Sequence, residues 1–228
     1  MRATLLATPD LSRKLAAEFL GTAALVCTVI GSGIMADALS SDDAVSLLGN
    51  TMATAAMLFV LISLLGPISG AHFNPAVSLV FTLLRQLSPG LALVYTAAQV
   101  SGGLVGTLAA HAMFDLPLFE ISSKARQGSS QSFSELVASF GLIVTILGGL
   151  RMRPQAVPAF VALYITAAYW FTASTSFANP AVAIARAFTD TFAGIRPSDV
   201  PAFILAELVG AGLAMLLAGW LFAPKDAA

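Results

Sequence analysis

Charge is the scarcest property of this sequence of 228 residues. Only 10% of the residues are Asp, Glu, Lys or Arg, whereas 57% are hydrophobic. A soluble domain carries about a quarter charged residues. The formal net charge of -1 also leaves no basic excess of the kind that nucleic-acid binding requires. The composition therefore excludes a nucleic-acid-binding domain and an ordinary soluble domain, and it indicates a membrane protein.

Cysteine and histidine are scarce as well. The single cysteine, Cys27, cannot form an internal disulfide bond, and two histidines are too few for a zinc cluster. We therefore expect no metal and no cofactor. An intramembrane enzyme is a remote alternative, because no His, Asp or Lys lies beside Ser174, Ser176 or Cys27 to activate a nucleophile.

The few charged residues divide the chain into apolar stretches. A bilayer core accepts runs of about 20 apolar residues, and six candidate spans result, in the stretches 19–36, 44–84, 86–114, 136–150, 154–185 and 200–224. Two stretches are too long for one helix. A break at 66–70 leaves the tail 73–84, and a polar break at 173–176 precedes a second tail. Both tails are predicted to be re-entrant half-helices, because 12 residues rise only about 18 Å.

The two tails begin alike, with Asn-Pro-Ala-Val at 74–77 and at 179–182. Asparagine is a good helix cap and proline suits the first helical position. Glu18 lies 56 residues before Asn74, and Glu135 lies 44 before Asn179. These positions indicate one domain, 1–228, with duplicated halves 12–114 and 133–222 and an outer connecting loop 115–132. Because each half holds three spans, the second copy is inverted, and the half-helices are predicted to meet tip to tip.

Two helix N-termini that face one point make a positive midplane, which repels cations. If the side-chain oxygens of Asn74 and Asn179 cap the half-helices, their amide hydrogens stay free to donate to a passing hydroxyl. The plain alternative is that each asparagine is only a cap. Gln99 and Glu207, which lie 25 and 28 residues after these asparagines, are candidate counterparts of each other with no role assigned.

The distribution of Lys and Arg predicts the orientation in the membrane. Seven lie on the side of the termini and four on the other: Arg2, Arg13, Lys14, Arg85, Arg151, Arg153 and Lys225 against Lys124, Arg126, Arg186 and Arg196. The positive-inside rule then places both termini in the cytoplasm. We expect a multi-pass protein surrounded by lipid in the inner (plasma) membrane of the cell.

The sequence resembles the major intrinsic proteins, the family of aquaporins and glycerol facilitators. The resemblance covers about residues 18–222 and rests on Glu18, Glu135, the lead-in at 69–72 and the paired motifs Asn74, Pro75 and Ala76, and Asn179, Pro180 and Ala181. It implies an all-α membrane fold of six transmembrane helices and two re-entrant half-helices, assembled as a homotetramer that passes small uncharged solutes. It also implies that Glu18 and Glu135 are structural acids that bind the re-entrant loop of their own half. The alternative for each is a solvated carboxylate at the interface.

The sequence departs from the family at the outer constriction. An arginine usually follows the second Asn-Pro-Ala, and here that residue is Val182. Counting without gaps gives Thr54, Ala167 and Ser176 as the other filter residues, with the register of Ala167 open. Thr54 replaces the usual aromatic residue. The filter is therefore expected to be wide, and the nearby aromatic residues are assigned to an interfacial belt, with one of them able to edge the pore: Tyr169, Trp170 and Phe171.

A wide filter favours glycerol-like polyols, urea and neutral metalloids in addition to water. The sequence is similar to bacterial members found with arsenic-resistance genes, which also carry valine at this position. Trivalent arsenic acid (arsenite) and methylated arsenicals are therefore leading candidates. The alternatives are a water-selective aquaporin and, less favoured, an ion-coupled secondary transporter, for which only Glu18, Glu135 and Glu207 are available as intramembrane acids.

Arg186 has the position to replace the missing filter charge. It lies four residues after Val182, on the same helix face and one turn farther out. Helical side chains lean toward the N-terminus, so its guanidinium is expected to reach back toward the filter. The alternatives are a vestibule charge paired with Asp190 and a solvated group. His72, two residues before Asn74, is expected to line the inner vestibule.

Overall fold

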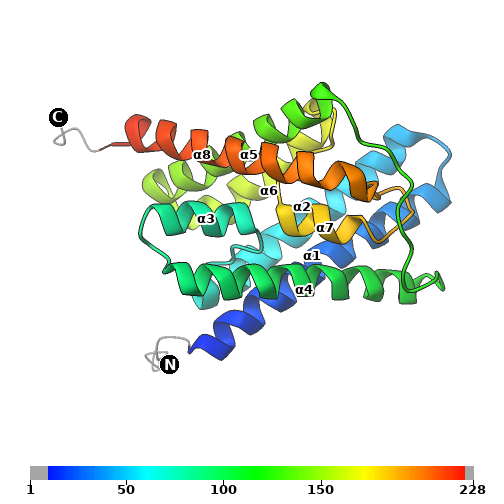
Figure 1. Cartoon of the computed structure of the whole chain (residues 1–228), viewed down its shortest axis with the longest axis horizontal. Helices are drawn as coiled ribbons and strands as arrows, with labels where there is room; N and C mark the ends of the chain where they lie inside the picture. Colours follow the sequence, from blue (N-terminus) through cyan, green and yellow to red (C-terminus); the bar gives the residue numbers. More distant parts are fainter. Residues whose placement is uncertain (1–9, 224–228) are drawn as a thin grey trace.

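The computed structural model describes residues 10–223, and within them the chain is helical (Figure 1). Its long helices are α1 (Leu11–Leu39), α2 (Asp43–Ser69), α4 (Pro89–Met113), α5 (Ser129–Met152), α6 (Val157–Phe171) and α8 (Val200–Leu221). Two short helices, α3 (Pro75–Leu83) and α7 (Pro180–Arg186), each begin at the proline of an Asn-Pro-Ala motif. The 3-10 turns η1 (Pro154–Ala156) and η2 (Pro197–Asp199) precede α6 and α8. Thus α5 to α8 repeat the order of α1 to α4.

Five segments among the described residues are long and apolar enough to cross a membrane. They are α1, α2, α4, α5 and the segment Pro197–Leu221 that contains α8. The remaining long helix, α6, has 15 residues and is directly preceded by η1. A continuous helix of about 20 residues spans a bilayer, so the sixth crossing uses η1 together with α6.

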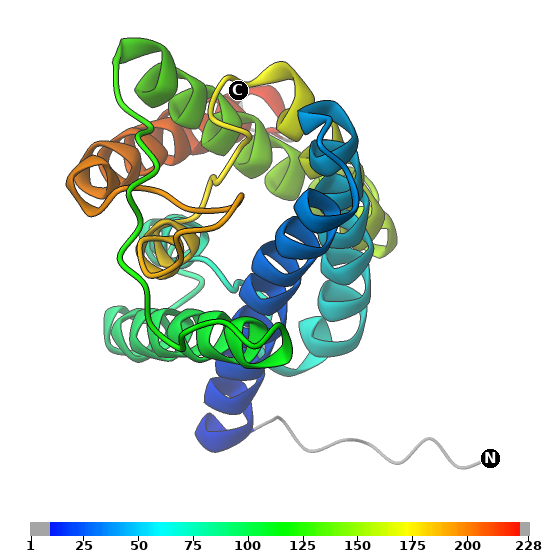
Figure 2. The same ribbon diagram turned by 90° about the vertical axis from the view of Figure 1, so that its right-hand side faces the viewer.

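The two short helices point in opposite directions. α1 begins and α8 ends on the same side of the molecule, which we call the terminal side, and the opposite side is the far side (Figure 1). From the centre, α3 runs toward the terminal side and α7 toward the far side. The connection between α4 and α5 crosses the far side (Figure 2). Because α5 begins at Ser129, this connection is shorter than the expected loop 115–132.

The first and last helices of each half are in backbone contact. A Cβ atom at Gly102 of α4 would lie 2.3 Å from the carbonyl oxygen of Phe19, and one at Gly210 of α8 would lie 2.2 Å from that of Leu136. Small residues allow this close approach of membrane helices. Phe19 and Leu136 directly follow Glu18 and Glu135. In each half, the close contact between the first and last helices therefore lies directly beside the acid, Glu18 or Glu135.

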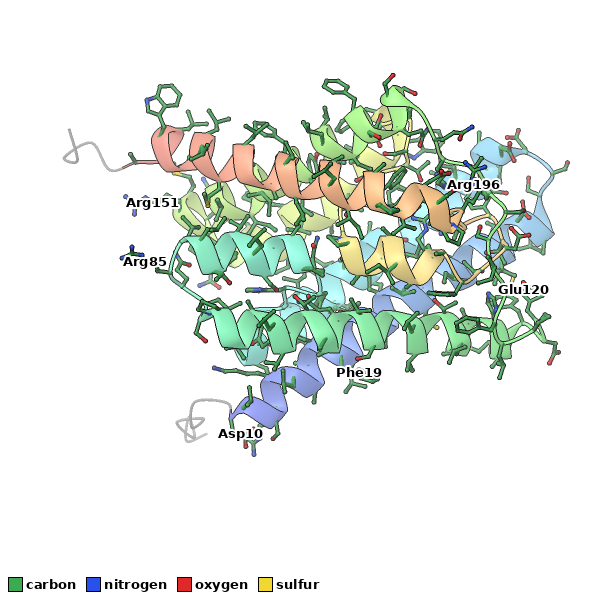
Figure 3. All side chains as sticks on the ribbon, in the orientation of Figure 1. Asp10, Phe19, Arg85, Glu120, Arg151 and Arg196 are labelled. Atoms are coloured by element: carbon green, nitrogen blue, oxygen red, sulfur yellow. The ribbon has the colours of Figure 1, made fainter. Side chains whose placement is uncertain are left out.

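Charged and apolar side chains are separated along the molecule (Figure 3). Arg85 and Arg151 lie at the terminal side, and Glu120 and Arg196 lie at the far side. Large apolar side chains are exposed on the middle parts of the helices between these ends, including Val105, Leu163 and Leu213, as expected for a surface in contact with lipid. Arg2 and Lys225, which were counted with the terminal side in the sequence, lie outside the described residues.

Candidate functional site

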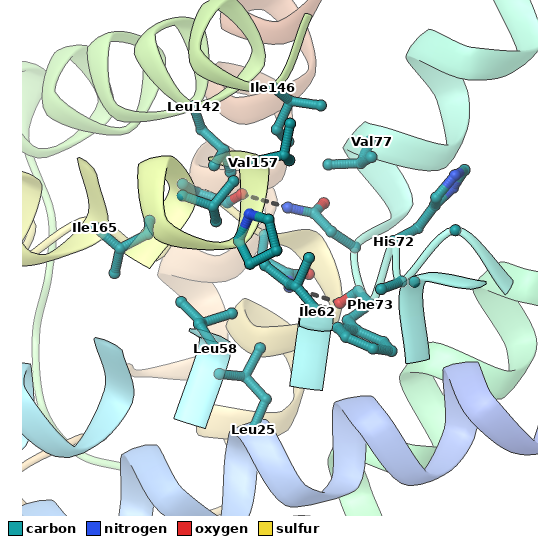
Figure 4. A pocket seen from close by; sticks show the side chains of 18 of the residues that line it. Leu25, Leu58, Ile62, His72, Phe73, Val77, Leu142, Ile146, Val157 and Ile165 are labelled. Carbon is teal, nitrogen blue, oxygen red and sulfur yellow. Dashed lines mark hydrogen bonds between the residues drawn. The ribbon is translucent and has the colours of Figure 1, made fainter. Parts of the chain in front are cut away.

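The tips of the two half-helices meet at the centre of the molecule. Asn74 caps α3 and Asn179 caps α7, each accepting a hydrogen bond from the amide two residues on (2.8 and 3.0 Å). Each side-chain amide also donates to the opposite loop: Asn74 Nδ2 to the carbonyl of Ala178 (2.7 Å) and Asn179 Nδ2 to that of Phe73 (2.8 Å), the dashed lines of Figure 4. The prediction that the half-helices meet tip to tip is confirmed.

These hydrogen bonds show that the expectation for the side-chain amides of the two asparagines is partly wrong. Both hydrogens of each side-chain amide were expected to be free, but one of them is used by the opposite loop. A primary amide has two N–H groups, so each asparagine keeps one. Asn74 and Asn179 both line the central cavity. They can therefore offer one donor each to a solute.

Glu18 holds the first re-entrant loop from inside the protein. Its Oε1 accepts hydrogen bonds from Ser69 Oγ (2.6 Å) and the backbone amide of His72 (2.9 Å). Its Oε2 accepts from the amide of Phe73 (2.7 Å) and from Gln99 Nε2 (2.8 Å). Irregular backbone at membrane depth needs partners within the protein. The alternative of a solvated interfacial carboxylate is wrong, because Glu18 is 0% exposed.

Two carboxylates hold the second loop. Glu135 accepts hydrogen bonds from the amides of Phe177 (2.9 Å) and Ala178 (2.7 Å), and Glu207 accepts from the amide of Asn179 (3.0 Å). Glu135 is completely buried, so the interfacial alternative is wrong for it as well. Glu207 thus acquires a role that the sequence left open. Its counterpart in the first half, Gln99, donates a hydrogen bond to the buried acid Glu18.

A cavity of about 550 Å³ runs past the half-helix tips. Its wall is mostly apolar and comes from α1, α2, α5, α6, the two re-entrant loops and the half-helices α3 and α7; Leu25, Leu58 and Ile165 are among the residues drawn in Figure 4. His72 also lines it, with Nδ1 3.0 Å from Ser78 Oγ. The cavity therefore combines an apolar lining with a few polar groups placed at its centre, which is typical of binding sites for small molecules.

Three of the four predicted filter residues line this cavity: Thr54, Ser176 and Val182. The prediction for Ala167 is wrong, because this residue is exposed on the outer surface and does not line the cavity. The residues of α6 that face the cavity include Ile165 and Tyr169, which are one helical turn apart. Ala167 lies two residues from each and therefore about 200° around the helix.

Comparison with known proteins identifies the fold and the family. The sequence matches the profile of the family described as "Major intrinsic protein" over residues 5–217. The chain belongs to the major intrinsic protein family. This family consists of membrane channels for small neutral solutes and not of enzymes. The predicted family membership is thus confirmed, and this major intrinsic protein is a multi-pass membrane channel.

Individual relatives agree with the family assignment. This major intrinsic protein is 60% identical over 215 residues to "Aquaglyceroporin AqpS" of Rhizobium meliloti (strain 1021), covering 94% of this chain and 92% of that protein. It is 32% identical over 138 residues to "Aquaporin NIP6-1" of Arabidopsis thaliana, covering 60% and 45%. The X-ray structure of the aquaglyceroporin from Plasmodium falciparum superposes with a TM-score of 0.76 at 21% identity, covering 94% and 98%. The last comparison confirms the predicted aquaporin fold.

Arg186 lies inside this major intrinsic protein and lines its cavity. The residue is 3% exposed, its Nε donates to the carbonyl of Ala193, and its Cζ lies 3.4 Å from the centre of the Phe177 ring. Asp190 is not its partner, because that carboxylate accepts hydrogen bonds from the amide (2.8 Å) and hydroxyl of Ser123. The alternatives of a vestibule pair with Asp190 and of a solvated group are therefore both wrong.

A second arginine, Arg126, lies near the cavity, although the sequence did not indicate it as a candidate site residue. Arg126, from the connection on the far side, donates to the carbonyls of Gly194 (2.8 Å) and Ser174 (3.1 Å), and its Cζ lies 5.0 Å from the Phe177 ring centre. Burial lowers the pKa of Arg126 to about 10, so its guanidinium is charged at neutral pH. Phe177 thus contacts two cations, Arg126 and Arg186. No sequence signal marks Arg126, because its place depends on the path of the connection.

Proposed function

We propose that this protein is a passive channel for neutral solutes larger than water. The substrate classes are glycerol-like polyols, urea and neutral trivalent metalloids such as arsenite and methylated arsenicals, and water passes as well. The observation that carries the proposal is the lining of the cavity: it includes Val182 at the position where the family usually has an arginine, and Thr54 at the position where it usually has an aromatic residue. The 60% identity to a protein named an aquaglyceroporin along nearly the whole chain supports it.

The two half-helix tips are proposed to act as the charge barrier. Each helix N-terminus carries about half a positive charge, and here two N-termini face each other across the asparagine contacts. A neutral hydroxylated solute receives one hydrogen bond from Asn74 and one from Asn179, whereas a cation is repelled. Pro75 and Pro180 begin the half-helices, and Ala76 and Ala181 supply the capped amides.

Arg186 is proposed to supply the fixed positive charge of the far-side filter, beside Thr54, Ser176 and Val182. Its burial and its place in the cavity wall support this role. Within residues 10–223 its terminal nitrogens have no hydrogen bond, since only Nε has a partner. These nitrogens are therefore available to a solute that accepts hydrogen bonds. The filter charge thus comes from one turn farther along α7 than is usual.

The structure gives little support to an ion-coupled transporter. The candidates that the sequence offered for coupling are its intramembrane acids, and one of them would have to lie on the solute path. Glu18, Glu135 and Glu207 are completely buried and bind the loop backbones. None of the three is part of the cavity wall among the described residues. A passive channel needs no such group.

The surroundings of the channel belong to the same proposal. We place one channel domain, 1–228, with inverted halves 12–114 and 133–222, in the inner (plasma) membrane with both termini in the cytoplasm. Arg85 and Arg151 at the terminal side support this orientation (Figure 3). The protein is proposed to assemble as a homotetramer in contact with lipid.

A solute panel in liposomes tests the function and the role of Arg186 together. Stopped-flow permeabilities of water, glycerol, urea and arsenite are expected to exceed those of protein-free liposomes. In Arg186→Ala, the glycerol-to-water ratio is expected to rise up to about tenfold, because a charged side chain no longer fills the cavity end. Arg151→Ala, an exposed arginine at the terminal side, is the matched control and should behave as wild type. Wild-type permeabilities equal to those of empty liposomes would contradict the function, and an unchanged ratio in Arg186→Ala would remove that residue from the filter.

A further inference from the structure

Glu207 occupies the place in the second half that Gln99 occupies in the first. Each lies three residues before the glycine, Gly210 or Gly102, at which the first and last helices of its half come into backbone contact. In the first half, Gln99 Nε2 donates a hydrogen bond to the buried acid Glu18 (2.8 Å). In the second half, the corresponding side chain is itself an acid that lies beside an acid.

Three consecutive backbone amides hold Glu135 and Glu207, the acid pair, close together. Glu135 accepts hydrogen bonds from the amides of Phe177 and Ala178. Glu207 Oε1 accepts from the next amide, that of Asn179. The two acid side chains are also in hydrogen-bond contact with each other. Both are 0% exposed, so no bulk water screens one from the other.

A hydrogen bond between two carboxyl groups needs one proton, because an ionised carboxylate can only accept. Glu207 Oε2 is the atom that is free to carry it. Both oxygens of Glu135 accept from backbone amides, whereas Glu207 Oε2 is buried and receives no hydrogen bond from any group in residues 10–223. Two like charges at such a buried site repel each other strongly, and one shared proton removes this repulsion.

The other titratable groups around the acid pair are two cations and two tyrosines. The cations are Arg186 of α7 and Arg126 of the connection between α4 and α5, and the tyrosines are Tyr164 and Tyr169 of α6. The half-helix α3, which also packs against α8, contains no titratable residue. One shared proton leaves the acid pair with a single negative charge beside two guanidinium groups. The positive charge proposed for the filter is therefore not cancelled.

We propose that Glu207 is a positioning residue that acts as a protonated acid. Its Oε2–H donates to Glu135 while its Oε1 accepts from the amide of Asn179, so the acid pair fixes the second re-entrant loop as one unit. Glu207 acts through Asn179, which lines the cavity, whereas neither acid does. The proton therefore stays in the protein wall and does not travel with the solute. The orientation of Asn179 toward a solute rests on the proposed function, and the shared proton does not.

The pH profile of thermal stability tests the shared proton, with Glu207→Gln as the comparison. The new side-chain amide donates to Glu135 and accepts from Asn179 without a titrating proton, so this variant should fold and conduct glycerol as wild type does at neutral pH. An unfolded glutamate ionises near about pH 4.3, whereas folded Glu207 keeps its proton. The unfolding midpoint of wild type relative to Glu207→Gln should therefore fall by about 3–5 °C per pH unit between about pH 5 and pH 8.

Temperature-dependent size-exclusion chromatography in detergent at each pH measures these midpoints. Asp37→Asn, an exposed acid of α1, is the matched control and should follow the wild-type profile. Glu135→Gln is the reciprocal variant. Both oxygens of Glu135 accept from amides, so an amide nitrogen at this position faces other donors and the folded fraction should fall.

Parallel pH profiles of wild type and Glu207→Gln would show that the acid pair holds no proton and would overturn the proposal. A poorly folded Glu207→Gln would overturn it as well, because its amide reproduces both hydrogen bonds of the protonated acid. A Glu135→Gln that folds as well as Glu207→Gln would remove the assignment of the proton to Glu207. The expected pH profile in a wild type that conducts no glycerol would contradict the proposed function alone, so the two failures are distinguishable.

Discussion

Replacing Glu18 with alanine is expected to abolish the folded channel. The change removes the acceptor of two backbone amides and of the side chains of Ser69 and Gln99. Three of these donors lose their partner, because Gln99 Nε2 keeps its bond to Ser78 Oγ (3.1 Å). Each buried polar group left without a partner costs about 1–3 kcal/mol, so the loss of three is comparable with the 5–15 kcal/mol or so that separates a native protein from its unfolded state. Temperature-dependent size-exclusion chromatography in detergent should show little or no folded protein.

Asp37→Asn provides the matched control for Glu18. Asp37 lies on the same helix, α1, but it is exposed at the far side, and its replacement should leave the folded fraction unchanged. Glu18→Gln should give an intermediate result, because the amide oxygen still accepts hydrogen bonds while the new N–H group faces other donors. A normally folded Glu18→Ala would show that the first re-entrant loop keeps its conformation without the carboxylate, contrary to our account.

Restoring the usual filter arginine with Val182→Arg is expected to lower glycerol and arsenite permeability by tenfold or more. Val182 is 5% exposed and lines the cavity from the first turn of α7, so a longer charged side chain must enter the path. One methylene group of misfit already changes discrimination by about 10- to 200-fold. Stopped-flow permeabilities of glycerol, arsenite and water in the same liposomes check this, and water should be affected least.

Val182→Ala is the control for this substitution, because it also changes the residue but adds no volume. Its glycerol permeability should be equal to or above that of wild type. If Val182→Arg folds and conducts glycerol as well as wild type, the far-side filter does not lie at Val182. The substrate range would then need another explanation.

The sequence predicted the parts of the site that depend on local chemistry. An asparagine followed by proline defines a helix start wherever it occurs, and both half-helices begin as expected at Pro75 and Pro180. The matched positions of Glu18 and Glu135 likewise led to the correct buried acids. These features follow from residues that are close in sequence or related by the duplication.

The sequence could not predict contacts between distant segments. Counting back from Asn179 assumed a fixed path between α6 and α7, and the assumption placed Ala167 in the filter, whereas Tyr169 faces the cavity. Which face of α6 turns inward is decided by packing against α2 and α5, and an apolar helix carries little pattern to reveal it. The position of Arg126 and the bonds of the asparagine amides to the opposite loop could not be predicted for the same reason, because they too depend on how distant segments pack.

Passive passage of neutral solutes with exclusion of charge is tested by measuring solute and proton movement in the same liposomes. Glycerol permeability would be followed by stopped-flow light scattering and proton entry by a trapped pH-sensitive dye, with and without a protonophore. We expect a glycerol flux that rises linearly with the gradient and is insensitive to the protonophore, with proton entry no faster than in protein-free liposomes. A saturating glycerol flux accompanied by proton entry would contradict the claim that the facing half-helix tips pass neutral solutes and exclude charge.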